Sequence, residues 1–236
     1  MSRSIPSDSV EESPAFLLID ASCSTNLVAL VVPQRQIRLT RTFTGREFPG
    51  ENLLSVCEEW MRARGITGKE LDFFATSHGP GSLTGLRVAG SFIRTLAQVC
   101  QKPVITLNSL WLLERSLGEA EREVVTVIQA RQDRYYVRLR SAPDPDEYDL
   151  LTAECFFEGC PPEALCCLEE RCDLVHRFPD RFAGRDYVLQ RLDPDRYIEG
   201  VSQAIRNRAG KGYGEIALHY GGLSVAEEIF YKKMRQ

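Results

Sequence analysis

Residues 78–101 read HGPGSLTGLRVAGSFIRTLAQVCQ, a glycine-rich turn followed directly by a long apolar segment. Gly79, Pro80 and Gly81 do not fit a regular element, and the apolar run before them, 71–77, predicts a strand that ends at the turn. After the turn, polar side chains recur every three or four positions, as on one narrow face of a helix over 82–100: Thr84, Arg87, Ser91, Arg94 and Gln98. The other faces are apolar, so this helix should be covered on more than one side.

Outward from this stretch, apolar patterning predicts the element order βββαβαβα, with strands at 16–20, 26–33, 36–43, 71–77 and 103–107 and helices at 51–64, 82–100 and 109–117. After the charged link 118–123 the pattern starts again. There we expect strands at 124–130, 135–140, 150–157, 185–192 and 227–234 and helices at 162–171 and 194–208. This repetition predicts a duplicated two-lobed α/β chain, with a flexible polar tail at 1–14, a first lobe at 15–118 and a second lobe at 119–236. A single mixed sheet with helices on both faces is the alternative.

The composition is that of an ordinary globular protein, with 43% hydrophobic and 26% charged residues. The formal net charge of -4 argues against a chain that binds nucleic acid by itself through a strong overall positive field. No apolar run is long enough to cross a membrane, and the first residues lack the apolar core of a signal peptide. We therefore expect a cytoplasmic protein.

Eight cysteines stand either singly or in one cluster. Cys23, Cys57 and Cys100 fall on predicted core faces, where reduced thiols act as small hydrophobic groups. The other five lack the C-x-x-C spacing of zinc ribbons: Cys155, Cys160, Cys166, Cys167 and Cys172. The spacing predicts reduced structural thiols, with a metal or redox role as the alternative.

Two features offer a contact for phosphate. Asp20 and Ser22 lie at the turn after the first strand, where a carboxylate and a hydroxyl suit a metal and a phosphate; alternatively, Asp20 caps backbone N–H groups of the turn. Gly79 and Gly81 precede a helix, whose N–H groups attract anions. The spacing of a Walker loop is absent, however, because Leu86 stands where that loop needs lysine, so we favour packing or partner contact.

The histidines are too far apart in sequence to form a paired metal site on one helix: His78, His176 and His219. No Ser/His/Asp triad or paired-carboxylate motif stands out either. The sequence therefore predicts no catalytic residue and no metal ligand.

GPGSLTGLR, together with the opening LLIDASCSTNLVALVV, resembles the bacterial TsaB (YeaZ) family over roughly residues 15–142. That family is the non-catalytic paralogue of TsaD in the synthesis of threonylcarbamoyladenosine on tRNA. The resemblance implies the actin, Hsp70 and sugar-kinase (ASKHA) fold. It also implies a scaffold that binds a TsaD-like catalytic subunit and a TsaE-like ATPase, forms a homodimer when alone and meets tRNA only through the complex. No cofactor of its own is implied, and ATP or ADP would bind at a complex interface.

Several positions depart from the family pattern. Gln129 opens the second-lobe corner where relatives often carry aspartate, the VGDG-type loop is missing, and PGENLL lacks the usual histidine. Residues 229–233 also replace a proline-bearing terminal strand. The alternative function is a small ASKHA-type ATPase or kinase acting at Asp20. A peptidase, the older family label, has no residue to support it.

The helices at 51–64 and 82–100 carry more apolar faces than one sheet can cover. We expect them to lie side by side and to form a partner surface from Leu54, Cys57, Trp60, Leu86, Ala89, Ile93 and Ala97. The resemblance points the same way, since TsaB-type chains pair through these helices. The alternative is that the rest of the chain buries both helices.

Overall fold

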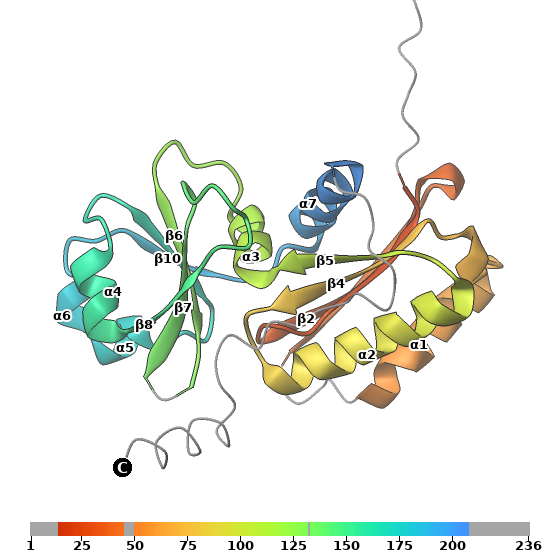
Figure 1. Ribbon diagram of the computed structural model, residues 1–236, viewed down its shortest axis with the longest axis horizontal. Coiled ribbons are helices and arrows are strands. Elements are labelled where there is room, and N and C mark those ends of the chain that lie inside the picture. The colour runs from red at the N-terminus through yellow and green to blue at the C-terminus, as the bar shows by residue number, and fades with distance from the viewer. Residues whose placement is uncertain (1–13, 45–49, 132, 208–236) are drawn as a thin grey trace, which may run out of the picture.

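The computed structural model describes residues 14–44, 50–131 and 133–207, which form two five-stranded sheets with helices on both faces (Figure 1). The first part has the predicted order βββαβαβα: β1 (Phe16–Asp20), β2 (Thr25–Val32), β3 (Ile37–Thr44), α1 (Gly50–Arg64), β4 (Phe73–Gly79), α2 (Leu83–Cys100), β5 (Val104–Asn108) and α3 (Ser109–Leu117). The second part contains β6 (Val124–Gln129), β7 (Arg134–Leu139), β8 (Asp149–Thr152), α4 (Ala153–Gly159), β9 (Leu165–Glu169), α5 (Leu174–Arg177), α6 (Pro179–Phe182), β10 (Tyr187–Gln190) and α7 (Pro194–Asn207).

The two sheets have the same topology. The first has the strand order β3-β2-β1-β4-β5 and the second β8-β7-β6-β9-β10. In each, the first three strands pair antiparallel and the last two add in parallel. This repeat confirms the predicted two-lobed α/β architecture and excludes the single mixed sheet.

The central strand β1 is apolar throughout because both of its faces are buried. Leu17 and Ile19 pack under α1 and α2, whereas Phe16 and Leu18 point to the opposite face, toward α7. Alternate side chains of a strand point to opposite faces, so a strand covered on both sides needs a continuous apolar run. The edge strand β3 is covered on one face only and alternates polar and apolar residues, as predicted.

Helix α3 lies between the two sheets (Figure 1). Its Leu112 packs in the cluster on the first sheet, while Leu110 and Leu113 pack in a cluster on the second. Helix α7 follows the second sheet in the chain but returns to the first, where Tyr197 and Val201 are buried beside α3. The division at residue 118 stays a prediction, and the return of α7 shows that the chain crosses between the two sheets more than once.

Two predicted elements of the second part are wrong. The strand expected over 150–157 is the short strand β8 followed by α4, and the helix expected over 162–171 is a turn followed by β9. Thr152 caps α4, because its side chain accepts a hydrogen bond from the backbone N–H of Cys155. Strand β9 lies between β6 and β10, and this pairing overrides the local helical pattern. The predicted strand 227–234 and tail 1–14, apart from residue 14, lie outside the described residues.

Among the described residues, no helix combines the length and the apolar character that crossing a membrane requires.

Candidate functional site

Asp20, at the carboxyl end of β1, is buried, and both of its carboxylate oxygens accept hydrogen bonds from the chain. Its Oδ1 accepts hydrogen bonds from the backbone N–H of Ser22, at 2.8 Å, and from the Ser77 hydroxyl, at 2.5 Å. Its Oδ2 accepts one from the Tyr197 hydroxyl of α7. Burial, reinforced by the Asp20 carboxylate, raises the pKa of Tyr197 well above its ordinary value, so this phenol stays a donor. The turn-capping alternative for Asp20 is confirmed by the bond to Ser22.

The glycine-rich turn is packed tightly against the first turn of the chain. The backbone N–H of Ser82 donates to the Ser22 carbonyl oxygen at 2.8 Å, and a Cβ on Gly81 would lie 2.3 Å from that same oxygen. A Cβ on Gly85 would lie 1.8 Å from the Ala21 carbonyl oxygen. Glycine is therefore required at both positions for close approach, which is the packing role that we favoured. Gly79 has a φ of 105° and marks the end of β4.

Two glutamates of the second sheet reach across to the first turn. Glu169 of β9 accepts hydrogen bonds from the Ser24 backbone N–H, at 3.2 Å, and from its hydroxyl. Glu170 accepts from the Ser24 hydroxyl at 3.1 Å and the Thr25 hydroxyl at 2.7 Å. Carboxylates thus bind the hydroxyl groups of Ser24 and Thr25, which follow the predicted phosphate contact at Asp20 and Ser22. Sequence reasoning missed both residues, because they lie about 145 positions from their partners.

The corresponding corner of the second sheet is also used for structure. The side-chain oxygen of Gln129 accepts a hydrogen bond from the backbone N–H of Asp173 at 3.1 Å, just before α5. Asp173 in turn accepts a hydrogen bond from the Tyr135 hydroxyl at 2.7 Å. The amide that stands in place of the family aspartate therefore holds the start of α5.

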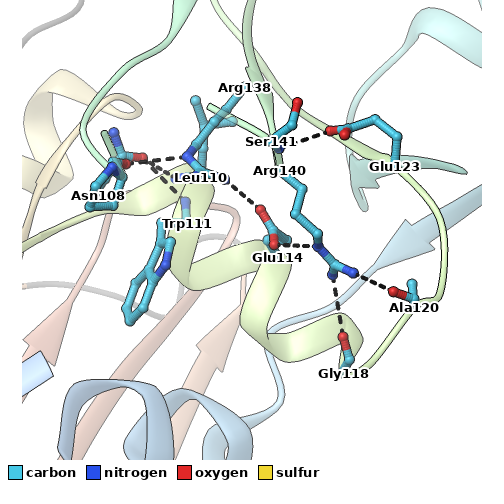
Figure 2. A network of polar contacts seen from close by, with 11 residues as sticks. Asn108, Leu110, Trp111, Glu114, Gly118, Ala120, Glu123, Arg138, Arg140 and Ser141 are labelled. Atoms are coloured by element: carbon cyan, nitrogen blue, oxygen red, sulfur yellow. Dashed lines mark hydrogen bonds and ion pairs between the residues drawn. The ribbon is translucent and has the colours of Figure 1, made fainter. Parts of the chain in front are cut away.

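Helix α3 carries a buried ionic network that joins it to β7 (Figure 2). Glu114 pairs with Arg138 at 2.6 Å and with Arg140 at 2.7 Å. Arg140 also donates to the Ala120 carbonyl oxygen at 2.9 Å. At the start of the helix, the Asn108 side chain accepts hydrogen bonds from the backbone N–H groups of Leu110, at 2.8 Å, and Trp111, at 3.2 Å. The network fixes α3 between the two sheets.

The α2 residues that we expected on a partner surface instead face the interior of the chain. Leu86, Ala89, Ile93 and Ala97 are each 0% exposed, and three of them belong to the cluster beneath the first sheet, together with Cys57. This side of α2 lies on the first sheet, because the glycine turn holds the start of the helix close to the strands. Trp60 is half-buried at the edge of that cluster, and the side chain of Leu54 lies outside the described residues.

The outward face of α2 divides into a polar and an apolar part. The predicted polar stripe is exposed throughout, from Thr84 to Gln98. Beside it runs an apolar row made of Val88, Phe92 and Leu96, which are half-buried, and Val99, which is 74% exposed. Both α1 and α2 lie on one face of the first sheet and share its cluster (Figure 1). Whether this face forms a partner surface stays a prediction.

All eight cysteines are free thiols. Within the described ranges, no three His, Cys, Asp or Glu side chains gather as a metal site would require. His78 is buried, with its Nε2 at 3.4 Å from Asp146, whereas His176 is exposed on α5 and His219 lies outside the described residues.

Comparison with known proteins finds similarity to TsaD and TsaB proteins. The model of the TsaD family, tRNA N6-adenosine threonylcarbamoyltransferase, matches residues 50–155. The tRNA threonylcarbamoyladenosine biosynthesis protein TsaB of Haemophilus influenzae is 29% identical over 127 residues, which cover 51% of each chain. TsaB of Buchnera aphidicola is 25% identical over 87 residues, 36% of this chain and 39% of its own. The chain thus spans about half, or less, of the length of these relatives by sequence.

The structural match extends further. YeaZ from Pseudomonas aeruginosa superposes with a TM-score of 0.66 at 19% identity, over 86% of this chain and 97% of its own. The chain is similar to the TsaB/YeaZ proteins in sequence and in fold. The TsaB/YeaZ resemblance inferred from the glycine turn is therefore confirmed, and so is the two-lobed fold that it implied.

Proposed function

We propose that this TsaB-family chain takes part in the synthesis of threonylcarbamoyladenosine on tRNA, as a non-catalytic scaffold that binds a TsaD-like catalytic subunit. The relatives named for that pathway support the first part of the proposal. The proposal includes a TsaE-like ATPase as a further partner, a homodimer when the chain is alone, and action in the cytoplasm. Any ATP or ADP binds at an interface of the complex, and tRNA is met only through the complex.

One observation supports the scaffold role above all: the corner that an ATPase of this fold would need is filled by the chain itself. Asp20 accepts three hydrogen bonds and is 1% exposed. Freeing it for a metal or phosphate would leave the Ser77 and Tyr197 hydroxyl groups buried without this acceptor, which costs about 1–3 kcal/mol for each. This cost weighs against an ATPase or kinase centred on Asp20.

The apolar row on α2 is the surface that we propose for the partner. Val99 is a large apolar side chain left largely in water, and Phe92 and Leu96 continue the row toward the glycine turn. Polar residues border the row on the same helix, as is typical of a protein interface. In this proposal the apolar row, and not the buried residues of α2, contacts the partner.

Reconstitution with a TsaD-like subunit tests the proposal. We expect the purified chain to bind the subunit directly and to be required for threonylcarbamoyladenosine formation on tRNA. The Val99→Arg variant should weaken binding by at least about tenfold, because it places a charge on an apolar contact. Gln98→Arg, one position away on the polar stripe, is the matched control and should bind normally.

Two results would contradict the proposal. Full modification activity without this chain would remove it from the pathway. ATP turnover by the isolated chain that disappears in Asp20→Ala would instead support the ATPase alternative.

A further inference from the structure

Cys160 and Cys166 bring their sulfur atoms to 3.8 Å from each other in the second lobe. Cys160 caps the end of α4, where its backbone N–H donates to the Phe156 carbonyl oxygen, and Cys166 is the second residue of β9. The short turn between them is closed by a hydrogen bond from Ala164 to Pro161 at 3.2 Å. A disulfide has a sulfur separation of about 2 Å, so the two sulfur atoms need to approach by only about 2 Å.

The two thiols differ in acidity. The hydrogen bond from the Cys166 thiol lowers the pKa of Cys160 below that of an ordinary thiol, and the Arg185 guanidinium adds to the shift. Arg185 is held in place by bonds to the carbonyl oxygens of Cys160, at 3.1 Å, and Pro161, at 3.3 Å. The same sulfur contact and burial raise the pKa of Cys166. The thiolate therefore resides on Cys160, and the thiolate is the reactive form of cysteine.

Access also favours Cys160. Its residue is 6% exposed, whereas Cys166 is 0% exposed. Cys167, the next residue on β9, points to the other face of the sheet, into the cluster beside α3, and burial raises its pKa to about 12. A small oxidant thus meets a single acidic thiol that has one neighbouring thiol behind it.

We propose that Cys160 and Cys166 form an oxidisable dithiol site that takes a peroxide and closes an intramolecular disulfide. The Cys160 thiolate attacks one oxygen of hydrogen peroxide, the O–O bond breaks, and hydroxide leaves, which produces a sulfenic acid on Cys160. The Cys166 sulfur then attacks the Cys160 sulfur. The hydroxyl group of the sulfenic acid leaves and, with the proton from Cys166, forms water. Two electrons pass from the two sulfurs to the peroxide, and two thiols and one peroxide yield one disulfide and two waters.

The bond would tie the end of α4 to β9, the strand that ends in Glu169. Glu169 and Glu170 accept hydrogen bonds from Ser24 and Thr25 of the first lobe. The dithiol site therefore lies on the strand whose carboxyl end contacts that lobe. The redox state of this pair is therefore placed to affect this hydrogen-bonded contact between the two lobes.

Peptide mapping of the full chain tests the proposal. The reduced protein is treated with one equivalent of hydrogen peroxide, blocked with an alkylating agent and cleaved after glutamate. Cleavage after Glu158 and Glu163 separates Cys155, Cys160 and Cys166 into different peptides. We expect a loss of two alkylatable thiols, a peptide containing Cys160 linked to the peptide 164–169, and recovery of both thiols on treatment with dithiothreitol.

Serine variants assign the bond within peptide 164–169, which also contains Cys167. The link should persist in Cys167→Ser, the matched control, and disappear in Cys160→Ser and Cys166→Ser. A link that survives in Cys166→Ser, or wild-type protein in which the exposed Cys155 is consumed before any link forms, would overturn the proposal. The wild-type map decides the question even where a variant fails to fold.

Discussion

Replacing Glu114 by glutamine should destabilise the protein strongly, because it removes the carboxylate that pairs with both Arg138 and Arg140 (Figure 2). The side chain of Glu114 is 9% exposed and that of Arg138 is 4% exposed, so the remaining guanidinium stays in a poorly solvated position. Arg138 would then keep its hydrogen bond to the Pro145 carbonyl oxygen, at 3.2 Å, but would lose its carboxylate partner. Breaking a buried ion pair in this way costs about 3–5 kcal/mol.

The surface provides a control of the same length. Arg122 and Asp186 also approach to 2.6 Å, but their side chains are 43% and 68% exposed. Asp186→Asn should therefore cost no more than about 1 kcal/mol, since water and salt screen an exposed pair. Because the two ion pairs have the same N–O distance, a difference in stability between the two variants reports the effect of burial.

Thermal unfolding followed by circular dichroism and tryptophan fluorescence measures both effects. For a chain of this size, Glu114→Gln should lower Tm by about 6–20 °C. Exchanging both Glu114 and Arg138 for methionine should recover most of the loss, because the buried guanidinium that lacks a partner is then removed. If Glu114→Gln and Asp186→Asn lower Tm equally, the reasoning from burial is refuted.

Three further outcomes follow from burial and packing. Ala89→Arg should yield insoluble or unfolded protein, because this side chain is 0% exposed, whereas Val99→Arg on the outer face of the same helix should fold normally in a solubility and circular dichroism assay. Gly85→Ala should cost at least about 1–3 kcal/mol in urea denaturation, because its Cβ would lie 1.8 Å from a backbone oxygen, while Gly159→Ala, with nothing within 4 Å, should be neutral or slightly stabilising; equal losses would contradict the packing role. Burial raises the pKa of Cys57 from 9.0 to about 12, so between these pH values only the unfolded chain loses this proton and the free energy of unfolding falls as pH rises. Cys57→Ala should make this decline shallower by about 1.4 kcal/mol per pH unit near pH about 10.5, and an unchanged slope would show that the thiol is not protected.

Local sequence determined the first lobe nearly to the residue. The glycine turn, the alternation of β3 and the polar stripe of α2 are short-range patterns, and each produced the element that it predicts. Ser82 is likewise a local signal: it caps α2, because its side chain accepts a hydrogen bond from the backbone N–H of Gly85. These features depend only on residues within a few positions of one another, which is why the sequence alone could specify them.

Tertiary structure decided which way each element faces and where the second lobe places its strands. The sequence of β9 has a pattern that fits a helix, but its hydrogen bonds to β6 on one side and β10 on the other make it a strand. The row from Leu86 to Ala97 was expected to meet a partner and instead packs on the sheet, because Gly85 lets α2 approach the first turn.

The engagement of Asp20 likewise depends on the folded chain. Its partner Tyr197 lies 177 residues away on α7, and Glu169 reaches Ser24 across 145 residues. No local pattern encodes such contacts, because they arise only when α7 returns to the first sheet and β9 is placed beside the first turn. The sequence therefore carried the TsaB/YeaZ resemblance and the fold, while long-range packing decided that the corner containing Asp20 is closed by the protein's own side chains.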